Sequence, residues 1–264
     1  MPSLPFTLID GWVAPPPRPE RVRWLRERSY AHRGLHRAGI PENSLAAAAG
    51  AIAAGLGIEC DVQKSRDGEA MVFHDWELDR LTGERGAVGA RTASEIAAIG
   101  LSGSGGERIP TLRDLLALVD GQVPLLIEVK SKRERRPAPL CLAVRRALEG
   151  YAGQVAVMSF DPRVSRWFAV HAPHIVRGLV VSEENERTFA GLMRRHAWLW
   201  HARPDFLAYD VRDLPSRFAS AQRERGLPLL TWTVRSAELR ERAEKYADAP
   251  IAEGAGVAQP GSAA

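Results

Sequence analysis

The chain has 264 residues with a hydrophobic content of 45% and a charged content of 26%, values that exclude a disordered or fibrous protein. Its net charge of +4 is carried mainly by arginine, with 32 Arg and only four Lys. Because Arg and Glu are intermixed along the chain, without a basic block interleaved with aromatic residues, we predict no nucleic-acid partner.

Cysteines and apolar segments restrict the class of protein further. Cys60 and Cys141 lack metal-ligand spacing and are too few for a disulfide framework, so we expect buried thiols in a reducing compartment. No stretch approaches the roughly 18 apolar residues of a membrane span. The first residues lack the basic start and continuous apolar segment of a secretory signal, which predicts a cytoplasmic protein.

Strand-like and helix-like segments alternate between two irregular ends. Residues 1–27 are rich in proline and are predicted to be an extended lead-in, and residues 255–264 to be a disordered tail. Apolar runs, several bounded by Gly or Pro, predict strands at 29–32, 57–62, 70–74, 125–130, 155–160, 175–181, 206–211 and 229–234. Helices are predicted at 44–54, 92–99, 111–119, 139–149, 162–171, 185–199, 215–226 and 236–246. The predicted N-caps are Asn43 or Ser44, Thr111, Asp161 and Ser236.

This alternation predicts the α/β class and a TIM-like (β/α)₈ barrel, formed as a single domain with its core at about 28–254. One joint is irregular, because the segment between Val62 and Ala70 is too short for a crossover helix and its Asp67-Gly68 pair indicates a tight turn. A doubly wound sheet is the alternative fold, but no Gly-rich phosphate-binding fingerprint follows an early strand.

Three carboxylates lie inside apolar runs that are predicted to be buried strands. Glu59 and Asp61 belong to the strand at 57–62, and Glu128 belongs to the strand at 125–130. Side chains alternate across a strand, so Glu59 and Asp61 share one face. Burying unpaired carboxylates costs several kcal/mol, so we predict that the three bind one oxygen-seeking divalent cation. A buried salt-bridge cluster with Arg33 and Lys130 is the alternative.

Imidazole and basic side chains follow the same strand ends. His32 and Arg33 end the first predicted strand, His74 ends the third, and Lys130 ends the fourth. Because barrel enzymes carry their sites at the C-terminal ends of the strands, we expect these side chains to gather at one rim. A phosphodiester needs this set: cationic groups for the non-bridging oxygens, a base for the nucleophile and an acid for the leaving alkoxide.

Several short motifs occur in an order that is informative as a set. They are His32-Arg33-Gly34, Pro41-Glu42-Asn43-Ser44, Glu59-x-Asp61-Val62, Asp67-Gly68, His74-Asp75, Ile109-Pro110-Thr111-Leu112, Glu128-Val129-Lys130 and Thr231-Trp232-Thr233-Val234. Together they resemble the glycerophosphodiester phosphodiesterase family, within the PLC-like phosphodiesterase superfamily, from residue 29 to about residue 254. The chain departs from the family pattern at 247–254, where the usual closing Thr-Asp-x-Pro is absent.

The resemblance implies hydrolysis of a small-molecule glycerophosphodiester to sn-glycerol 3-phosphate and an alcohol. It implies a TIM-like barrel with a small insertion after the third strand, and one divalent cation, Mg²⁺ or Ca²⁺. The implied site residues are Glu59, Asp61 and Glu128 for the metal, His32 and His74 for acid–base catalysis, and Arg33, Lys130 and Trp232 for the substrate. Trp232 would line the pocket near the alcohol.

Two other functions are alternatives. A lysophospholipase-D-like hydrolase would act on lysophospholipids and would need an apolar groove beside Trp232 and an interfacial surface. A catalytically idle barrel would bind phosphorylated ligands without turnover, although such a module needs no buried set of metal carboxylates. The head group, the identity of the metal, the assignment of acid and base between the two imidazoles, and the oligomeric state are left open.

Overall fold

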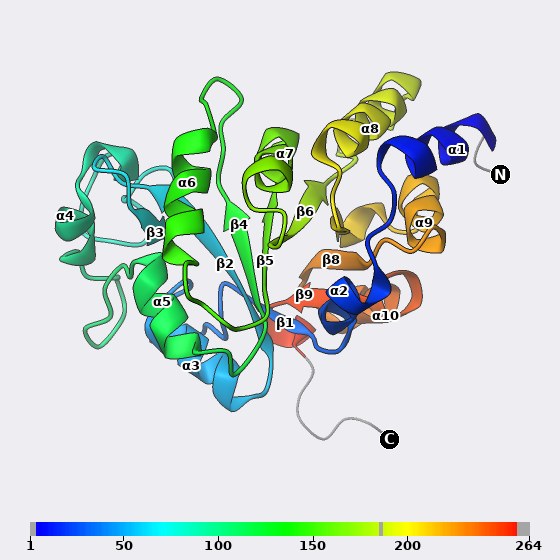
Figure 1. Cartoon of the computed structure of the whole chain (residues 1–264). Helices are drawn as coiled ribbons and strands as arrows, with labels where there is room; N and C mark the ends of the chain where they lie inside the picture. Colours follow the sequence, from blue (N-terminus) through cyan, green and yellow to red (C-terminus); the bar gives the residue numbers. More distant parts are fainter. Residues whose placement is uncertain (1–3, 185–186, 258–264) are drawn as a thin grey trace. The chain divides into compact units, whose positions relative to one another are not determined.

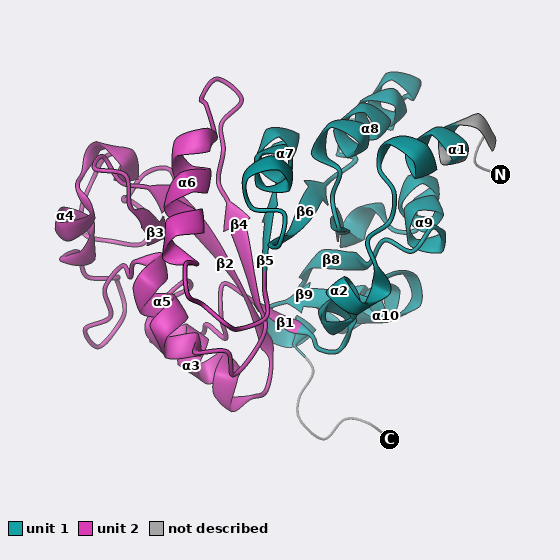
Figure 2. Cartoon of the chain, viewed as in Figure 1, with its two compact units in different colours: residues 1–29, 156–258 teal, residues 30–155, 259–264 magenta. Residues whose placement is uncertain are grey.

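The computed structural model describes residues 4–184 and 187–257 (Figure 1). These residues form two compact units (Figure 2). Unit 2 consists of residues 30–155, and unit 1 consists of the described residues up to 29 and from 156 onwards. Each unit has its own strands, helices and buried side chains, and each is described separately below.

The strands of unit 2 surround β2, the strand that carries two of the predicted metal ligands. They are β1 (Tyr30–His32), β2 (Gly57–Lys64), β3 (Ala70–Val72) and β4 (Leu125–Val129). Strand β2 is parallel to β1 and to β4, and antiparallel to β3. The predicted irregular joint is therefore confirmed, and it is a hairpin in which the Ser65 N–H donates to the Glu69 carbonyl oxygen at 3.0 Å.

The helices of unit 2 begin where capping residues stand in the sequence. They are α3 (Leu45–Ala53), α4 (Ala93–Ala97), α5 (Leu112–Val119) and α6 (Ala138–Ala147), with the 3₁₀ turn η2 (Val88–Ala90). Thr111 caps α5, as predicted, and of the two candidates Asn43 and Ser44 it is Ser44 that caps α3. Helix α5 buries its apolar residues at the spacing of one helical face, and it packs against α3.

The segment between β3 and α5 is the predicted insertion, and it has a small core of its own. Met71, Phe73, Leu78, Ile96 and Ile109 are among the buried side chains of this cluster. Because the insertion is held by its own apolar contacts, it can present polar residues at fixed positions beside the end of β2.

The strands of unit 1 are parallel neighbours in chain order. They are β5 (Val155–Ser159), β6 (Val176–Val181), β7 (Phe206–Asp210), β8 (Leu229–Val234) and β9 (Ala249–Ala252). Strand β9 was not predicted, because its four residues include Pro250 and give no alternating pattern. The prediction counted the strand at 70–74 among eight barrel strands. The antiparallel pairing of β3 corrects this, and β9 takes the place of the eighth parallel strand.

The helices of unit 1 agree with the predicted segments after residue 160. They are α7 (Pro162–His171), α8 (Phe189–Ala202), α9 (Arg217–Glu224) and α10 (Ala237–Tyr246), with the 3₁₀ turns η3 (Val211–Asp213) and η4 (Gly254–Gly256). Asp161 and Ser236 cap α7 and α10, as predicted. Helix α8 begins at Phe189 instead of residue 185, and positions 185–186 lie outside the described residues. Ala255 and Gly256 belong to η4 and not to the predicted disordered tail, whose positions 258–264 lie outside the described residues.

The lead-in is the part of the chain for which the prediction was wrong. Residues 1–27 were expected to be extended, but they contain α1 (Leu4–Val13), α2 (Pro19–Val22) and the 3₁₀ turn η1 (Arg23–Arg26). The proline run that suggested extension begins only after α1 ends. Helix α1 is held by the buried carboxylate of Asp10, which accepts hydrogen bonds from Trp200 Nε1 at 2.7 Å and Gln222 Nε2 at 2.7 Å. His196 Nδ1 lies 2.9 Å from the same carboxylate.

We expect Asp10→Asn to lower the free energy of unfolding by about 1–3 kcal/mol at pH 7, since buried donors lose a charged acceptor. Burial raises the pKa of Asp10, but hydrogen bonds from His196, Gln222 and Trp200 lower it below its ordinary value. A lowered folded-state pKa stabilises the fold above the unfolded-state pKa, and this contribution disappears as the pH falls. The free energies of unfolding of Asp10→Asn and wild type, measured with urea, should therefore become more similar below about pH 4.

The exposed Glu20→Gln serves as a control for Asp10→Asn, because it also removes one carboxylate from the same N-terminal segment. It should leave the free energy of unfolding within about 0.5 kcal/mol of wild type. An Asp10→Asn difference that stays constant from neutral to acid pH would contradict the stabilising charge assigned to Asp10.

Among the described residues, no helix combines the length and the apolar character that crossing a membrane requires.

Candidate active site

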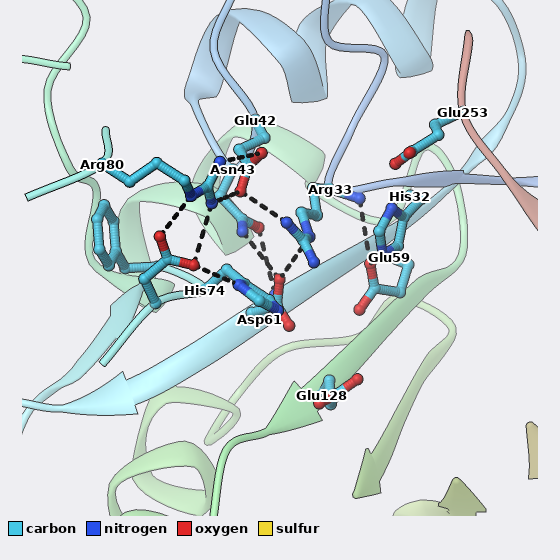
Figure 3. Close-up of polar contacts among 12 residues, drawn as sticks. His32, Arg33, Glu42, Asn43, Glu59, Asp61, His74, Arg80, Glu128 and Glu253 are labelled. Atoms are coloured by element: carbon cyan, nitrogen blue, oxygen red, sulfur yellow. Dashed lines mark hydrogen bonds and ion pairs between the residues drawn. The ribbon is translucent and has the colours of Figure 1, made fainter. Parts of the chain in front are cut away.

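The register of the unit 2 strands places the predicted site residues on one face. His32 is the partner of Glu59 across the β1–β2 pair, and Asp61 is the partner of Glu128 across the β2–β4 pair. Paired residues on neighbouring strands point the same way, and so do residues two apart on one strand. The four side chains therefore converge from three strands, as Figure 3 shows.

The three carboxylates form one buried cluster. Glu59, Asp61 and Glu128 each have a carboxylate oxygen within 4.8 Å of the others. The side chains of Glu59 and Asp61 are 2% exposed, and that of Glu128 is 13% exposed. Burial, together with the charges of Asp61 and Glu128, raises the pKa of Glu59 well above its ordinary value. Three carboxylates this close together need positive charge nearby, and they are a ligand set that fits a hard divalent cation.

Two basic side chains compensate part of this negative charge. Arg33 Nε lies 3.2 Å from Asp61 Oδ2, and Lys130 Nζ lies 3.2 Å from Asp61 Oδ1 and 2.9 Å from Glu128 Oε1. Burial raises the pKa of Asp61, but the charges of Lys130 and Arg33 bring it below its ordinary value. The salt-bridge cluster considered as the alternative is therefore partly present. The basic side chains of this cluster pair with Asp61 and Glu128, whereas Glu59 accepts a hydrogen bond from the backbone N–H of Arg33 at 3.1 Å.

The backbone around Arg33 is unusual, which marks a position set by the surrounding structure. Arg33 has φ 57° and Asn43 has φ 58°, both in the left-handed region that non-glycine residues seldom adopt. Arg33 Nη1 donates to Glu42 at 2.7 Å, whereas its buried Nε has no hydrogen-bond acceptor among the described residues. Arg33 Nε and Asp61 therefore form an ion pair, but their geometry is not that of a hydrogen bond.

Asn43 has a role that the sequence-based interpretation missed. The sequence predicted only a capping role, for either Asn43 or Ser44, and the structure assigns the cap to Ser44. Asn43 Nδ2 instead donates to Asp61 Oδ2 at 3.0 Å, and its Oδ1 accepts the Asp61 backbone N–H at 3.2 Å. Asn43 therefore holds both the carboxylate and the backbone N–H of Asp61.

His74 is held by the carboxylate of Asp75, the residue that follows it in the chain. His74 Nδ1 lies 2.6 Å from Asp75 Oδ1, and Arg80 Nε donates to Asp75 Oδ2 at 2.5 Å. Arg80 also donates to Glu42 at 2.7 Å, which links the His74 side of the site to Arg33 (Figure 3). Burial raises the pKa of Asp75, but hydrogen bonds from Arg80 and His74 lower it to about 2. Asp75 is therefore ionised at neutral pH and orients the imidazole through Nδ1.

Gln63 is a further residue that the sequence did not single out, although it continues the alternation of Glu59 and Asp61 along β2. Its Nε2 donates to the carbonyl oxygen of His74 at 3.0 Å and also contacts that of Asp75. No sequence pattern marks Arg80, because it lies in the insertion and its contact with Glu42, 38 residues away, depends on the tertiary fold. The spacing on β2 was the one signal that could have identified Gln63.

Trp232 belongs to unit 1, where it is positioned by contacts within that unit. It lies on β8, donates from Nε1 to the carbonyl oxygen of Ala208 at 3.0 Å, and packs edge-on against Phe160 at 5.3 Å between ring centroids. The other predicted site residues all lie in unit 2. The role of Trp232 beside the substrate alcohol therefore stays a prediction.

Comparisons with known proteins place these residues in a family context. The family model described as glycerophosphoryl diester phosphodiesterase family matches residues 32–254. A glycerophosphodiester phosphodiesterase of Caldanaerobacter subterraneus is 31% identical over 80% of this chain and 87% of its own length. One from Bacillus altitudinis is 36% identical over a shorter part, 39% of this chain and 44% of its own length.

Solved structures extend the likeness to the fold. A putative glycerophosphoryl diester phosphodiesterase from Silicibacter pomeroyi has a TM-score of 0.74 at 25% identity, covering 88% of this chain and 93% of its own. An Oleispira antarctica phosphodiesterase, solved with the product sn-glycerol 3-phosphate, has a TM-score of 0.73 at 23% identity, covering 85% and 92%. The predicted fold class, a TIM-like (β/α)₈ barrel with an irregular joint after its second strand, is confirmed. The chain belongs to the glycerophosphoryl diester phosphodiesterase family of phosphoric diester hydrolases.

Proposed function

We propose that this enzyme hydrolyses glycerophosphodiesters to sn-glycerol 3-phosphate and an alcohol, with a divalent cation and with His32 and His74 as the acid–base pair. The observation that carries the proposal is the cluster of three buried carboxylates on one strand face, with His32 Nε2 3.9 Å from Glu59 Oε2. A binding module or a stabilising ion pair has no need for a third buried carboxylate whose pKa is raised.

Glu59, Asp61 and Glu128 would hold Mg²⁺ or Ca²⁺, which would supply positive charge against the non-bridging oxygens of the phosphate. Arg33 is suited to the same phosphate, because its buried Nε has no hydrogen-bond acceptor among the described residues. Lys130 would contribute a second positive charge, since its Nζ already reaches the carboxylates at the edge of the site.

The two imidazoles would move the protons of the reaction. His32 would accept the proton of the nucleophile, either water or the adjacent hydroxyl of the glycerol moiety. As the new P–O bond forms, the bond to the alcohol breaks, and its electron pair leaves with the alcohol oxygen. His74 would protonate that oxygen from Nε2, because Nδ1 is committed to Asp75. If the glycerol hydroxyl attacks, water then opens the resulting cyclic phosphate.

The test is release of glycerol 3-phosphate from a mixed set of glycerophosphodiesters, measured with Mg²⁺, with Ca²⁺ and with a chelator. Release that requires the cation is the expected result. Hydrolysis of lysophospholipids but of no water-soluble diester would replace this proposal with the lysophospholipase-D-like function. Binding of phosphorylated ligands without any turnover would indicate the catalytically idle barrel.

A further inference from the structure

A pocket of unit 2 adjoins the candidate active site. It is a pocket of about 150 Å³ beside the end of β2, the segment after His74 and the loop between β4 and α6. Gln63 and Lys130 belong to both the site and the wall of this pocket. The volume is several times the roughly 30 Å³ that one water molecule occupies in the liquid, which leaves room for a small charged group.

The wall of the pocket is strongly basic. Its acidic residue is Glu77, and its basic residues are Lys64, Lys130, Lys132, Arg135 and Arg136. Lys130 is paired with Asp61 and Glu128, which leaves four basic side chains against Glu77. The chain contains only four lysines among its 36 basic residues, and three of them line this one pocket. Lysine presents a compact charge on a flexible side chain, whereas the planar guanidinium of arginine fixes the geometry of its contacts. Lysine therefore suits a phosphate group that can bind in more than one position. Within residues 30–155, Arg135 and Arg136 have no acidic partner.

The aromatic residue of the pocket argues against a cationic ligand. Trp76 lines the wall, but the ammonium group of Lys132 lies over its ring at 4.7 Å from the centroid. A site for a quaternary ammonium group uses free aromatic faces. Here the ring face carries the protein's own cation, and the surrounding charges would repel a second one.

The pocket adjoins His74, because Gln63 in its wall donates to the His74 carbonyl oxygen at 3.0 Å. Trp76 follows His74 by two residues, and His74 is the proposed acid for the leaving oxygen. We infer that this pocket binds an anionic group, such as a phosphomonoester, carried by the alcohol of the glycerophosphodiester. The inference rests on the proposed function and narrows its substrate class to diesters whose alcohol is negatively charged.

The decisive experiment uses two substrates that differ in one group. These are sn-glycero-3-phosphoglycerol and the same diester with a phosphate on the terminal hydroxyl of the alcohol. We expect the enzyme to prefer the phosphorylated substrate in kcat/KM at low ionic strength by about tenfold or more. The double variant Lys132→Gln with Arg136→Gln should lower this ratio by about tenfold. Arg133→Gln, in the same loop but not in the pocket wall, should leave the ratio unchanged.

A binding measurement separates this inference from the proposed function. Calorimetric titration with inorganic phosphate in the presence of a chelator should give millimolar binding, weakened about tenfold by the Lys132→Gln/Arg136→Gln variant. That result would support the pocket even if no diester were hydrolysed, in which case only the proposed function fails. A substrate ratio near one, or a ratio and phosphate affinity that the double variant does not change, would overturn the inference. Thermal unfolding of each variant would verify that it is folded.

Discussion

Glu59→Gln and Asp61→Asn are expected to abolish binding of the divalent cation and to lower kcat/KM by about 10³ or more. Each change keeps the size of the side chain but replaces a carboxylate ligand with a neutral amide. Calorimetry with Mg²⁺ or Ca²⁺ would measure binding, and release of glycerol 3-phosphate would measure activity. Glu69→Gln, at an exposed position of the β2–β3 turn, removes the same charge outside the cluster and should change neither quantity.

Stability in the presence of a chelator would distinguish metal ligands from a stabilising ion-pair cluster. Glu59 is buried with like charges, so its ionised form costs free energy in the metal-free protein. We therefore expect Glu59→Gln to be at least as stable as wild type when the cation is absent. A clear loss of stability in that variant, together with unchanged cation binding, would show that Glu59 serves the fold and does not act as a ligand.

His74→Ala and His32→Ala are each expected to lower kcat by about 10²–10⁴, the range typical of removing a general acid or base. The two losses should respond differently to the leaving group. With p-nitrophenol in place of the natural alcohol, the departing oxygen needs no proton. The His74→Ala loss should then shrink, whereas the His32→Ala loss should stay.

This comparison also tests the assignment of acid and base. A His32→Ala loss that shrinks with the p-nitrophenyl substrate, while the His74→Ala loss persists, would reverse the two roles. Near-wild-type kcat for either variant would remove that residue from the mechanism. Asp75→Asn should lower kcat by about 10-fold or more while leaving KM close to wild type, because it disturbs the orientation of His74 and not substrate contact.

The sequence was sufficient for those features that depend on local patterns. The alternation on β2 placed Glu59 and Asp61 on one face, and the capping residues Thr111 and Asp161 set the starts of α5 and α7. The irregular joint followed from a length too short for a crossover. The structure confirmed each of these, because neighbouring residues alone decide them.

Features that depend on contacts distant in the sequence could not be predicted. Arg80 contacts Asp75, which lies only five residues before it, but it reaches Glu42, 38 residues away, only through the tertiary fold, and no pattern marks it. Helix α1 is stabilised by contacts of Asp10 with residues about 200 positions away, as its hydrogen bond to Gln222 illustrates, so its proline-rich surroundings were misleading. Strand β9 is too short for its own periodicity and is recognised only by its pairing with β8.

The two faces of β2 have a consequence for how this family member can change during evolution. One face carries Glu59, Asp61 and Gln63. The residues that alternate with them in the chain, Ile58, Cys60 and Val62, are buried on the other face. A substitution alters one side chain, but insertion or deletion of one residue would exchange the two faces over the rest of the strand. Charged groups would then enter the apolar packing, and apolar groups would replace them at the site. The length of β2 is therefore more constrained than its composition.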